Sequence, residues 1–384
     1  MTMNILHIIS SIDRGGAENH LFSLINEQIK KNNKVFICYF RGNDYWKKKY
    51  KGLGVKVNKI NISNSYNLFR VFYAVIYIYS KYRKYKSLII HCHLSISEVV
   101  GFFLKIIFLK KIKFIITKHL DSYYLEKYSD KEKIFFKGIF FEKIILSFAD
   151  HIIFISHFTK NYFLKNIKLK KNKYSIIYYG LSAKNWPILD SHQKKEFRKK
   201  YQISNKSFVI GNIARHVPQK GIEFLIKSYA EYLRLTNKRS KLILIGNGPD
   251  SKKIELLIKI YKLEKKIIKI KFTENVNAFY SIFDIFVLSS KHEGLGLVLL
   301  EALIKKVPII STTQSSIKEI IINKKNGLLV KFGDVHAMAT KIKELEDKFL
   351  RKKLIMCNSL ILNKKFNLDK MSELTLNIYK KLLI

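Results

Sequence analysis

The sequence feature that most constrains the fold is an apolar run that passes through a glycine turn into an apolar helix, at residues 285–303. The run Ile285–Leu288 is typical of a buried parallel strand, and the helix is expected to begin near Leu297. The turn between them contains Gly294 and Gly296. Because such a turn presents backbone N–H groups and the positive end of the helix dipole to a ligand, it predicts an anion-binding site.

Two glutamates bracket this turn. Glu293 precedes the helix and Glu301 lies within it. A carboxylate is unexpected beside a ligand that is only a phosphate, but its oxygens accept hydrogen bonds from sugar hydroxyls. The predicted ligand is therefore a phosphate that carries a sugar.

Apolar strands alternate with helices along the whole chain, which predicts the α/β class. The expected strands are residues 4–9, 34–40, 87–92, 113–117, 151–155, 175–179, 208–214, 241–245, 267–272, 284–288, 307–311 and 327–330. A length of 384 residues predicts two domains. The polar, basic stretch 183–205 is interpreted as the linker, so we expect domains at 1–182 and 183–365. A helical tail at 366–384 follows, and its apolar residues predict that it docks on another part of the protein.

Three cysteines, Cys38, Cys92 and Cys357, lie far apart and have neither metal-binding nor redox spacing. This pattern is typical of a reducing compartment and predicts no disulfide framework. The N-terminal apolar run is too short for a signal peptide, and no apolar stretch reaches the ~20 residues that a membrane span needs. We therefore expect a cytoplasmic protein, either soluble or peripheral to a membrane.

The formal net charge of +43 is extreme, but it is spread evenly. Residues 1–180 hold 32 of the 72 basic and 11 of the 29 acidic residues. An even spread favours composition bias and attraction to an anionic surface over a single nucleic-acid groove. Residues 131–148 mix aromatic residues with lysines, which fits either a helix seated on a lipid interface or a core helix with a charged edge.

Two candidate sites lie in the first half of the chain. Gly15 and Gly16 follow the first strand, where they either let the backbone approach a ligand or form a plain tight turn. His119 follows the strand 113–117, at the strand end where α/β enzymes place ligand groups, although a structural histidine is an equal alternative. His91 and His93 lack a third partner at metal spacing, so we interpret them as structural.

The second half adds a basic pair and a glycine pair. Arg215 and Lys220 stand at a strand–loop–helix junction, where arginine grips a phosphate in a planar fork and lysine adds a point charge. Gly246 and Gly248 are similar to the start of a dinucleotide fingerprint, but Ser251 stands where the third glycine belongs. That departure disfavours an NAD-dependent oxidoreductase.

In this order, the motifs resemble those of the family-4 retaining glycosyltransferases of the GT-B fold, most specifically over residues 208–334. The resemblance rests on Gly15-Gly16-Ala17-Glu18, His119, Ser156 with Thr159, Gly180, Arg215 with Lys220-Gly221, Gly246-Asn247-Gly248-Pro249, Glu293-Gly294-Leu295-Gly296 with Glu301, Asn326-Gly327, and Gly333-Asp334. It implies two Rossmann-like domains that face each other across a cleft, with the acceptor bound mostly by the first and the nucleotide sugar by the second. It also implies that the final helix returns to the N-terminal domain.

The resemblance implies specific roles. Arg215 and Lys220 would hold the donor diphosphate, Glu293 would contact the sugar hydroxyls, and His119 would sit near the reacting sugar; these four are the catalytic candidates. The other expected donor contacts are Gly16 at the diphosphate, the backbone N–H groups of Gly294, Leu295, Gly296 and Leu297 near the sugar and phosphate, and Glu301 at the ribose. One departure stands out, because Gln314-Ser315-Ser316 replaces a glycine pair that the family often has ahead of the position of Glu319.

The chain contains no Asp-x-Asp motif of the kind that holds a metal in GT-A enzymes. We therefore expect metal-independent transfer of a hexose-type sugar from a UDP-, GDP- or ADP-sugar, without a cofactor; retention is implied by the family alone. The expected acceptor is a glycan or a lipid-linked molecule in surface polysaccharide or lipopolysaccharide synthesis, with peripheral contact to the inner face of an anionic membrane and no nucleic acid. The alternative is a non-enzymatic basic protein that binds nucleic acid or anionic lipid.

Overall fold

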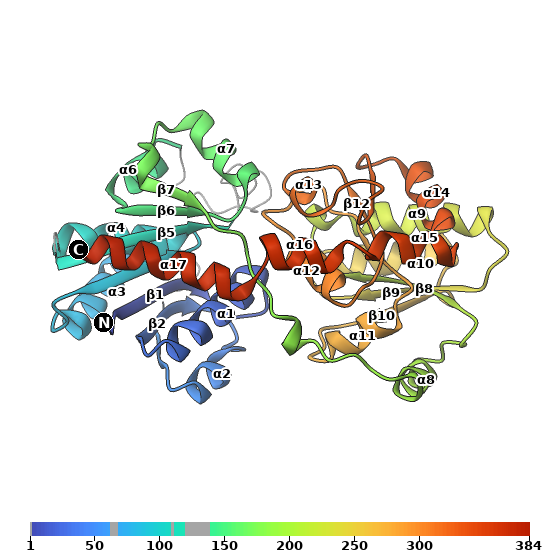
Figure 1. The fold of residues 1–384 in the computed structure, drawn as a ribbon, viewed down its shortest axis with the longest axis horizontal. Helices are drawn as coiled ribbons and strands as arrows, with labels where there is room; N and C mark the ends of the chain where they lie inside the picture. Colours follow the sequence, from blue (N-terminus) through green and yellow to red (C-terminus); the bar gives the residue numbers. More distant parts are fainter. Residues whose placement is uncertain (1, 62–67, 109–110, 120–138) are drawn as a thin grey trace. The chain divides into compact units, whose positions relative to one another are not determined.

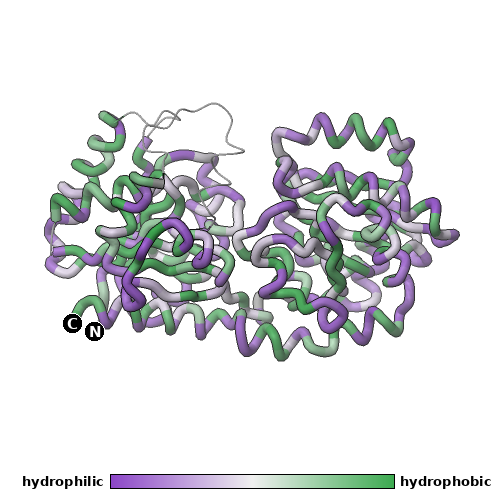
Figure 2. Tube along the Cα trace, turned by 90° about the horizontal axis from the view of Figure 1, so that it is seen from above, coloured by the Kyte–Doolittle hydropathy of each residue, from purple (hydrophilic) through white to green (hydrophobic). Residues whose placement is uncertain are grey.

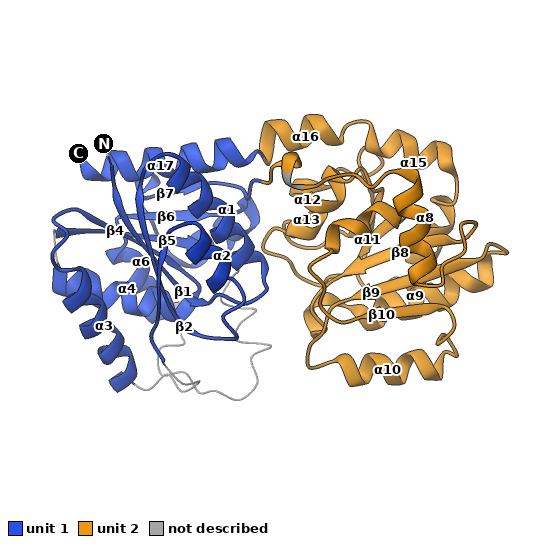
Figure 3. Cartoon of the chain, turned by 90° about the horizontal axis from the view of Figure 1, so that it is seen from below, with its two compact units in different colours: residues 1–180, 367–384 blue, residues 181–366 orange. Residues whose placement is uncertain are grey.

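The computed structural model describes residues 2–61, 68–108, 111–119 and 139–384 (Figure 1). The described chain forms two compact α/β units (Figure 3). The first comprises Met1–Gly180 together with Asn367–Ile384, and the second comprises Leu181–Phe366. Each unit is built on its own parallel sheet, so the expected class of two parallel α/β domains is confirmed.

The first unit contains a seven-stranded sheet in the order β3-β2-β1-β4-β5-β6-β7, and every neighbouring pair is parallel. Its strands are β1 (Asn4–Ser11), β2 (Lys34–Arg41), β3 (Lys56–Lys59), β4 (Leu88–His93), β5 (Ile112–Lys118), β6 (His151–Phe154) and β7 (Tyr174–Ile176). Sequence analysis missed β3, because this edge strand has only one apolar residue, Val57. The others are mostly apolar because helices bury both faces of a parallel sheet.

Helices cover both faces of this sheet. They are α1 (Gly16–Lys30), α2 (Lys47–Gly52), α3 (Leu68–Tyr82), α4 (Ser95–Phe108), α6 (Ile139–Phe148), α7 (His157–Asn166) and α17 (Leu368–Leu383). One core lies under α1 and α17, and a second lies under α3, α4 and α6. The predicted cap of α7 is confirmed, because the Ser156 hydroxyl accepts a hydrogen bond from the Thr159 backbone N–H at 3.0 Å.

The last helix, α17, belongs to the first unit although it ends the chain. Leu376 and Tyr379 are buried in the core that α1 also covers. Where the chain leaves the first unit and re-enters it, Gly180 lies against the backbone of Asn367 and Leu368, which leaves no space for a Cβ atom. The apolar residues of the tail therefore pack on the sheet and on α1.

The second unit contains a six-stranded parallel sheet in the order β10-β9-β8-β11-β12-β13. Its strands are β8 (Phe208–Ile213), β9 (Ser240–Ile245), β10 (Ile267–Ile270), β11 (Ile285–Leu288), β12 (Ile309–Thr312) and β13 (Leu328–Val330). Its helices are α8 (Ser191–Lys200), α9 (Ile222–Leu235), α10 (Ser251–Ile260), α11 (Val276–Ile282), α12 (Leu297–Ile304), α13 (Ile317–Ile320), α14 (Val335–Glu344), α15 (Lys348–Ile355) and α16 (Asn358–Lys365).

Both sheets follow the same winding order. In each, the chain adds two strands on one side of the first strand and then crosses to its other side, between β1 and β4 in the first unit and between β8 and β11 in the second. Sheets wound in this way bind ligands at the carboxyl ends of the two strands that flank the crossing. The topology therefore predicts one ligand-binding edge in each unit.

No helix in the described part of the chain is both long and apolar enough to span a membrane. Of the stretch 131–148, residues 131–138 lie outside the described residues. The remainder forms α6, in which Ile145 and Leu146 are buried and Phe140 is exposed.

The packing of α17 generates a stability prediction. Leu376 is 4% exposed and Leu374, on the same helix, is 41% exposed. Leu376→Ala is expected to lower the free energy of unfolding of the first unit by about 2–5 kcal/mol, because it leaves a cavity under the helix. Leu374→Ala should change it by less than about 0.5 kcal/mol. Urea unfolding of both variants measures the difference, and equal effects would contradict the docking of α17.

Candidate functional site

The winding change of the second unit is spanned by an ion pair. Lys220 follows β8 and Glu293 follows β11, and the lysine Nζ lies 2.6 Å from the glutamate Oε1. The lysine is half-buried and the glutamate buried. Two residues that the sequence singled out separately, 73 positions apart, thus meet at the edge where the topology predicts a ligand.

The loop after β11 is held by the loop after β8. The Ser289 hydroxyl donates a hydrogen bond to the Lys220 carbonyl at 2.9 Å, and the Lys291 backbone N–H donates to the Gln219 carbonyl at 2.8 Å. Gly221 has a positive φ of 60°, and a Cβ atom there would collide with the Ser289 carbonyl. Glycine is therefore needed where these two loops touch.

Two serines hold the backbone of Glu293 from the other side. The Ser315 hydroxyl accepts a hydrogen bond from the Glu293 N–H at 2.8 Å, and the Ser316 hydroxyl donates to the Glu293 carbonyl at 2.9 Å. The Ser290 hydroxyl donates to the carboxylate itself, at 2.6 Å. The departure noted at 314–316 thus places two side chains that fix Glu293. Sequence analysis missed this function because the serines lie in the loop after a different strand, β12.

Other predicted donor groups lie on the same two loops, after β8 and after β11. Gly294–Leu297 leads directly into α12, and Gly296 adopts a positive φ of 83° at its N-cap. Arg215 is exposed, and its side chain makes no hydrogen bond or ion pair with the described residues. The α12 N-terminus and a solvent-facing guanidinium are both suited to binding an anion.

Gly246 and Gly248, the first two positions of the broken dinucleotide fingerprint, have a structural role. A Cβ atom on either would collide with the backbone of the 214–216 segment, at the Ala214 and His216 carbonyls. The glycines let the loop after β9 pack against the loop that carries Arg215. This contact accounts for both glycines without a dinucleotide.

Glu301 lies inside the second unit, on α12. Its carboxylate is buried and accepts a hydrogen bond from the Tyr280 hydroxyl at 3.0 Å. Burial raises the pKa of Glu301 to about 7, and the Tyr280 hydrogen bond opposes that rise. Glu301 therefore sits close to the point where it exchanges a proton at neutral pH.

In the first unit, the loop after β1 is closed by Glu18. The side chain of Glu18 folds back over Gly15 and leaves no room for a Cβ atom there, and it accepts a hydrogen bond from the Ser11 hydroxyl at 3.0 Å. Gly16 begins α1. Gly15 thus makes room for a carboxylate from the first turn of α1, and the structure does not test the predicted contact between Gly16 and a diphosphate.

His119 is buried just beyond the end of β5, and both of its ring nitrogens are engaged. Its Nε2 lies 3.0 Å from the Nδ1 of His93, and its Nδ1 lies 2.5 Å from the Tyr179 hydroxyl. Burial lowers the pKa of His119 well below its usual value, so the ring is neutral. His119 is thus a fixed neutral ring.

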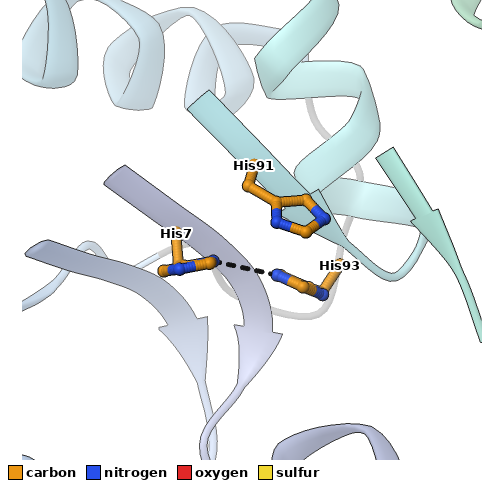
Figure 4. Close-up of side chains that lie close together, drawn as sticks. All are labelled: His7, His91 and His93. Carbon is orange, nitrogen blue, oxygen red and sulfur yellow. Dashed lines mark hydrogen bonds between the residues drawn. The ribbon is translucent and has the colours of Figure 1, made fainter. Parts of the chain in front are cut away.

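Sequence analysis missed a third histidine in this region, His7 on β1. It is the register partner of His91 on β4, and the ligand nitrogens of His7, His91 and His93 all lie within 4.8 Å of one another (Figure 4). The missing signal was strand parity: in an all-parallel sheet, histidines at equivalent heights on neighbouring strands face the same side. A rule based on spacing along the sequence fails here because the three residues come from two strands.

A buried ion cluster fixes the end of β5. The Lys118 Nζ lies 2.8 Å from Glu98 on α4 and 2.7 Å from Glu142 on α6. Burial alone would lower the pKa of Lys118, but the two carboxylates outweigh it and raise the pKa above its ordinary value. The cluster ties two covering helices to the strand that carries His119.

Two protein families match the chain. "Glycosyltransferase Family 4" matches residues 14–184, and "Glycosyl transferases group 1" matches residues 193–357. The two matches follow the division of the chain into two units and together cover most of it.

Individual relatives agree with the family matches. The capsular polysaccharide biosynthesis glycosyltransferase CapM of Staphylococcus aureus is 30% identical over 55% of this chain, which aligns with 56% of CapM. An uncharacterised 41.2 kDa protein from the cps region of Klebsiella pneumoniae is 27% identical over 98% of this chain and 99% of its own length. The chain thus spans about half of CapM and nearly all of the Klebsiella protein.

A similar fold occurs in Anabaena HepE, which was crystallised in complex with UDP and glucose. The TM-score is 0.84 at 17% identity, over 99% of this chain and 100% of the HepE chain. At this identity the likeness concerns the fold.

The environment of Glu301 generates a pH prediction. Because its folded pKa of about 7 exceeds the ordinary value of 4.5, its contribution to stability is complete below pH 4.5 and is lost as the pH rises to about 7. The loss is about 3 kcal/mol. Glu301→Gln should remove it, so the variant gains stability relative to the wild type across this range. Urea unfolding of both proteins at several pH values measures the gain.

The control is Glu264→Gln, at an exposed position of the same unit. Its difference from the wild type should stay constant with pH. A constant difference for Glu301→Gln as well would show that Glu301 titrates normally.

Proposed function

The chain belongs to the family-4 glycosyltransferases of the GT-B fold, and from this premise we propose that it transfers a hexose-type sugar from a nucleotide diphosphate to an acceptor, with retention and without a metal. The observation that carries the proposal is the ion pair between Lys220 and Glu293 at the winding change of the second unit. The pair brings together a cation that can bind a phosphate and a carboxylate that can accept hydrogen bonds from sugar hydroxyls.

The leaving nucleotide diphosphate gains negative charge as the bond to the sugar breaks. Preorganised positive groups stabilise such charge most effectively, because they need no reorganisation during the reaction. Lys220, Arg215 and the N-terminus of α12 are three such groups. Their presence supports transfer in which side chains and backbone N–H groups neutralise the leaving group.

Recognition of the sugar is assigned to carboxylates. Glu293 accepts hydrogen bonds from the Ser290 and Ser316 hydroxyls and donates one from its backbone N–H to Ser315, so its oxygens are positioned before a ligand arrives. Glu301 is proposed to accept hydrogen bonds from the ribose hydroxyls. Retention follows from family membership, and His119 is proposed to lie near the reacting sugar.

The proposed pathway is the synthesis of a cell-surface polysaccharide or lipopolysaccharide on a glycan or lipid-linked acceptor. CapM, the relative named for capsular polysaccharide biosynthesis, supports this assignment. UDP in the complex of the structurally similar HepE makes a UDP-sugar the first donor to test.

A basic surface on the first unit supports peripheral contact with an anionic membrane. Helix α3 is apolar on two opposite stripes and contains no acidic residue. Figure 2 colours the chain by the hydropathy of each residue. One stripe is buried: Val71, Ala74, Val75, Ile78 and Tyr82. The other, at positions 69, 72, 73 and 76, is exposed. A helix that is apolar all round needs a second apolar partner, and a lipid interface provides one.

The charges around α3 favour anionic lipid over a protein groove. Arg70, Lys81, Arg83, Lys84 and Lys86 are exposed on or after the helix. The acidic residues of the described neighbouring segments 68–118 and 139–150 are engaged by lysines, as in the pairs of Lys105 with Asp150 and of Lys118 with two glutamates. Positive charge beside exposed aromatic and aliphatic side chains is the composition of an interfacial surface.

Lys220 provides the test of transfer. Lys220→Met is expected to lower kcat by about 10²–10³ with UDP-sugars, because one group that stabilises the leaving diphosphate is lost. The matched control is Lys253→Met, which removes a lysine paired with Glu223 in the same unit but distant in sequence from the site. Transfer rates are measured by release of UDP, and thermal unfolding shows that both variants remain folded. Wild-type turnover by Lys220→Met would exclude the assignment.

The membrane surface is tested on α3. The double variant Phe72→Ser with Ile76→Ser removes two side chains that are 43% and 63% exposed. It should bind vesicles of anionic phospholipid at least about tenfold more weakly than the wild type. The control is Leu256→Ser with Ile260→Ser, an equally spaced pair on α10 that is 58% and 62% exposed.

Co-sedimentation at low and high salt provides the measurement, because the electrostatic part of binding weakens with salt. Equal binding by the two double variants would place the contact elsewhere. Absence of wild-type binding at low salt would remove the membrane contact.

A further inference from the structure

Three histidines interrupt an otherwise apolar face of the first sheet. The odd-numbered residues of β1 and β4 point into the core under α1 and α17, where Ile5, Ile9 and Ile89 are buried. His7, His91 and His93 share this parity and are 0% exposed. Apolar side chains would fill this space without any hydrogen-bonding requirement, so the histidines need an explanation beyond packing.

A metal is the first explanation to examine, because three histidines suit zinc. The ring nitrogens, however, already have protein partners. His7 bonds Gln28 and His93, at 2.9 and 3.0 Å. His93 also bonds His119, and His91 bonds Tyr379 and Thr117, at 2.5 and 2.7 Å. A metal would have to break these contacts, so the geometry favours a hydrogen-bond network (Figure 4).

All the rings in the network are neutral. Burial lowers the pKa of His7 to about 4 and holds the pKa values of His91, His93 and His119 well below the usual value. A neutral imidazole has one N–H donor and one acceptor nitrogen. Each ring therefore donates a hydrogen bond on one side and accepts one on the other. Because of this, the donor–acceptor direction at one end of a series of linked rings fixes the direction at every ring.

One end of this series of hydrogen bonds is the amide of Gln28 on α1. Its Oε1 lies 2.9 Å from the His7 Nε2, and its Nε2 lies 3.4 Å from the Tyr379 hydroxyl on α17. An amide oxygen only accepts, so the His7 Nε2 carries the hydrogen and the His7 Nδ1 accepts from His93. The same logic makes the His93 Nε2 a donor, and the His93 Nδ1 then accepts from the His119 Nε2.

At the far end, the His119 Nδ1 is left as an acceptor and takes its hydrogen bond from the Tyr179 hydroxyl. His20 stacks on the Tyr179 ring, with centroids 4.4 Å apart. The series of hydrogen bonds thus begins at a helix that covers the sheet and ends at two rings packed beyond the carboxyl ends of the strands. Reversal of the Gln28 amide would reverse the direction of every hydrogen bond in this series.

We propose that Gln28 is a positioning residue, which acts through His7 and His93 to hold His119 in one orientation and in its Nε2–H tautomer. The kinetic consequence rests on the proposed function, in which His119 lies near the reacting sugar. The tautomer itself does not depend on that function. The network accounts for His7 and His93, which carry the orientation of one amide, across two strands, to the edge of the sheet where the topology predicts a ligand. His91 is held separately, by Tyr379 and Thr117.

The tautomers are measured directly in the full-length protein labelled with ¹⁵N-histidine, by long-range ¹H–¹⁵N correlation. The expected wild-type spectrum shows His7, His93 and His119 as neutral Nε2–H tautomers at pH 7. Substitutions of single histidines assign the signals. An Nδ1–H tautomer at His93 or His119, or a charged ring, would overturn the proposal without any variant of Gln28.

Gln28→Met removes the terminal acceptor and keeps a side chain of similar length. It should give His119 a mixed tautomer signal and lower kcat about tenfold or more, with an unchanged KM for the nucleotide sugar, because the donor-binding side chains Lys220, Glu293 and Glu301 are proposed in the other unit. The matched control is Thr117→Val, which removes the acceptor of the His91 Nε2 and lies off the path to His119. It should lose similar thermal stability and keep the His119 spectrum and kcat.

Four further results test the proposal. Unchanged His119 signals in Gln28→Met would overturn the proposal, and so would equal effects of Gln28→Met and Thr117→Val on kcat. Stoichiometric Zn²⁺ binding that shifts the signals of His7, His91 and His93 would replace the network with a metal site. If the wild type transfers no sugar but the tautomers are as expected, the proposed function fails and the positioning of His119 by Gln28 stands.

Discussion

Parallel strand pairing is the constraint on which the rest of the molecule depends. Each parallel strand needs a crossover through a helix, so every loop that follows a strand emerges at the same edge of the sheet. Sheets of this kind bind ligands beside the two loops that flank the change of winding. In the second unit, Lys220 and Glu293 lie on the two loops that flank the change of winding. In the first unit, the loop after β1 and His93 at the end of β4 flank it.

Each candidate side chain is held by a second layer of contacts before any ligand binds. Ser315 and Ser316 form hydrogen bonds with the backbone of Glu293, and Ser289 forms one with the backbone of Lys220. In the first unit, Lys118 ties β5 to two helices. These polar contacts cost desolvation, and a core of apolar residues would fold as well without them. Their value lies in the position they impose, because small errors in the placement of reacting groups lower rates steeply.

Much of this architecture was predictable from local patterns. Continuous apolar runs identified every strand except β3, whose single apolar residue gives no such signal. Glycine turns and basic residues at strand ends identified Lys220 and Glu293 because the physical reason for them is local: a helix N-terminus, a phosphate and a carboxylate. The functions of Ser315 and His7 were missed, because their partners are distant in sequence and adjacent only in the sheet.

The amino-acid sequence by itself therefore determined the α/β class, the two domains and the residue types of the proposed sugar-phosphate site, since these depend on hydrophobic period, glycine position and charge along a short stretch. Only the tertiary structure decided which residues meet. It joined Lys220 to Glu293 and arranged the histidines of β1 and β4 into one hydrogen-bonded network that ends at His119. The physical reason is strand order: register and winding set which strand ends are neighbours, and no local pattern contains that information.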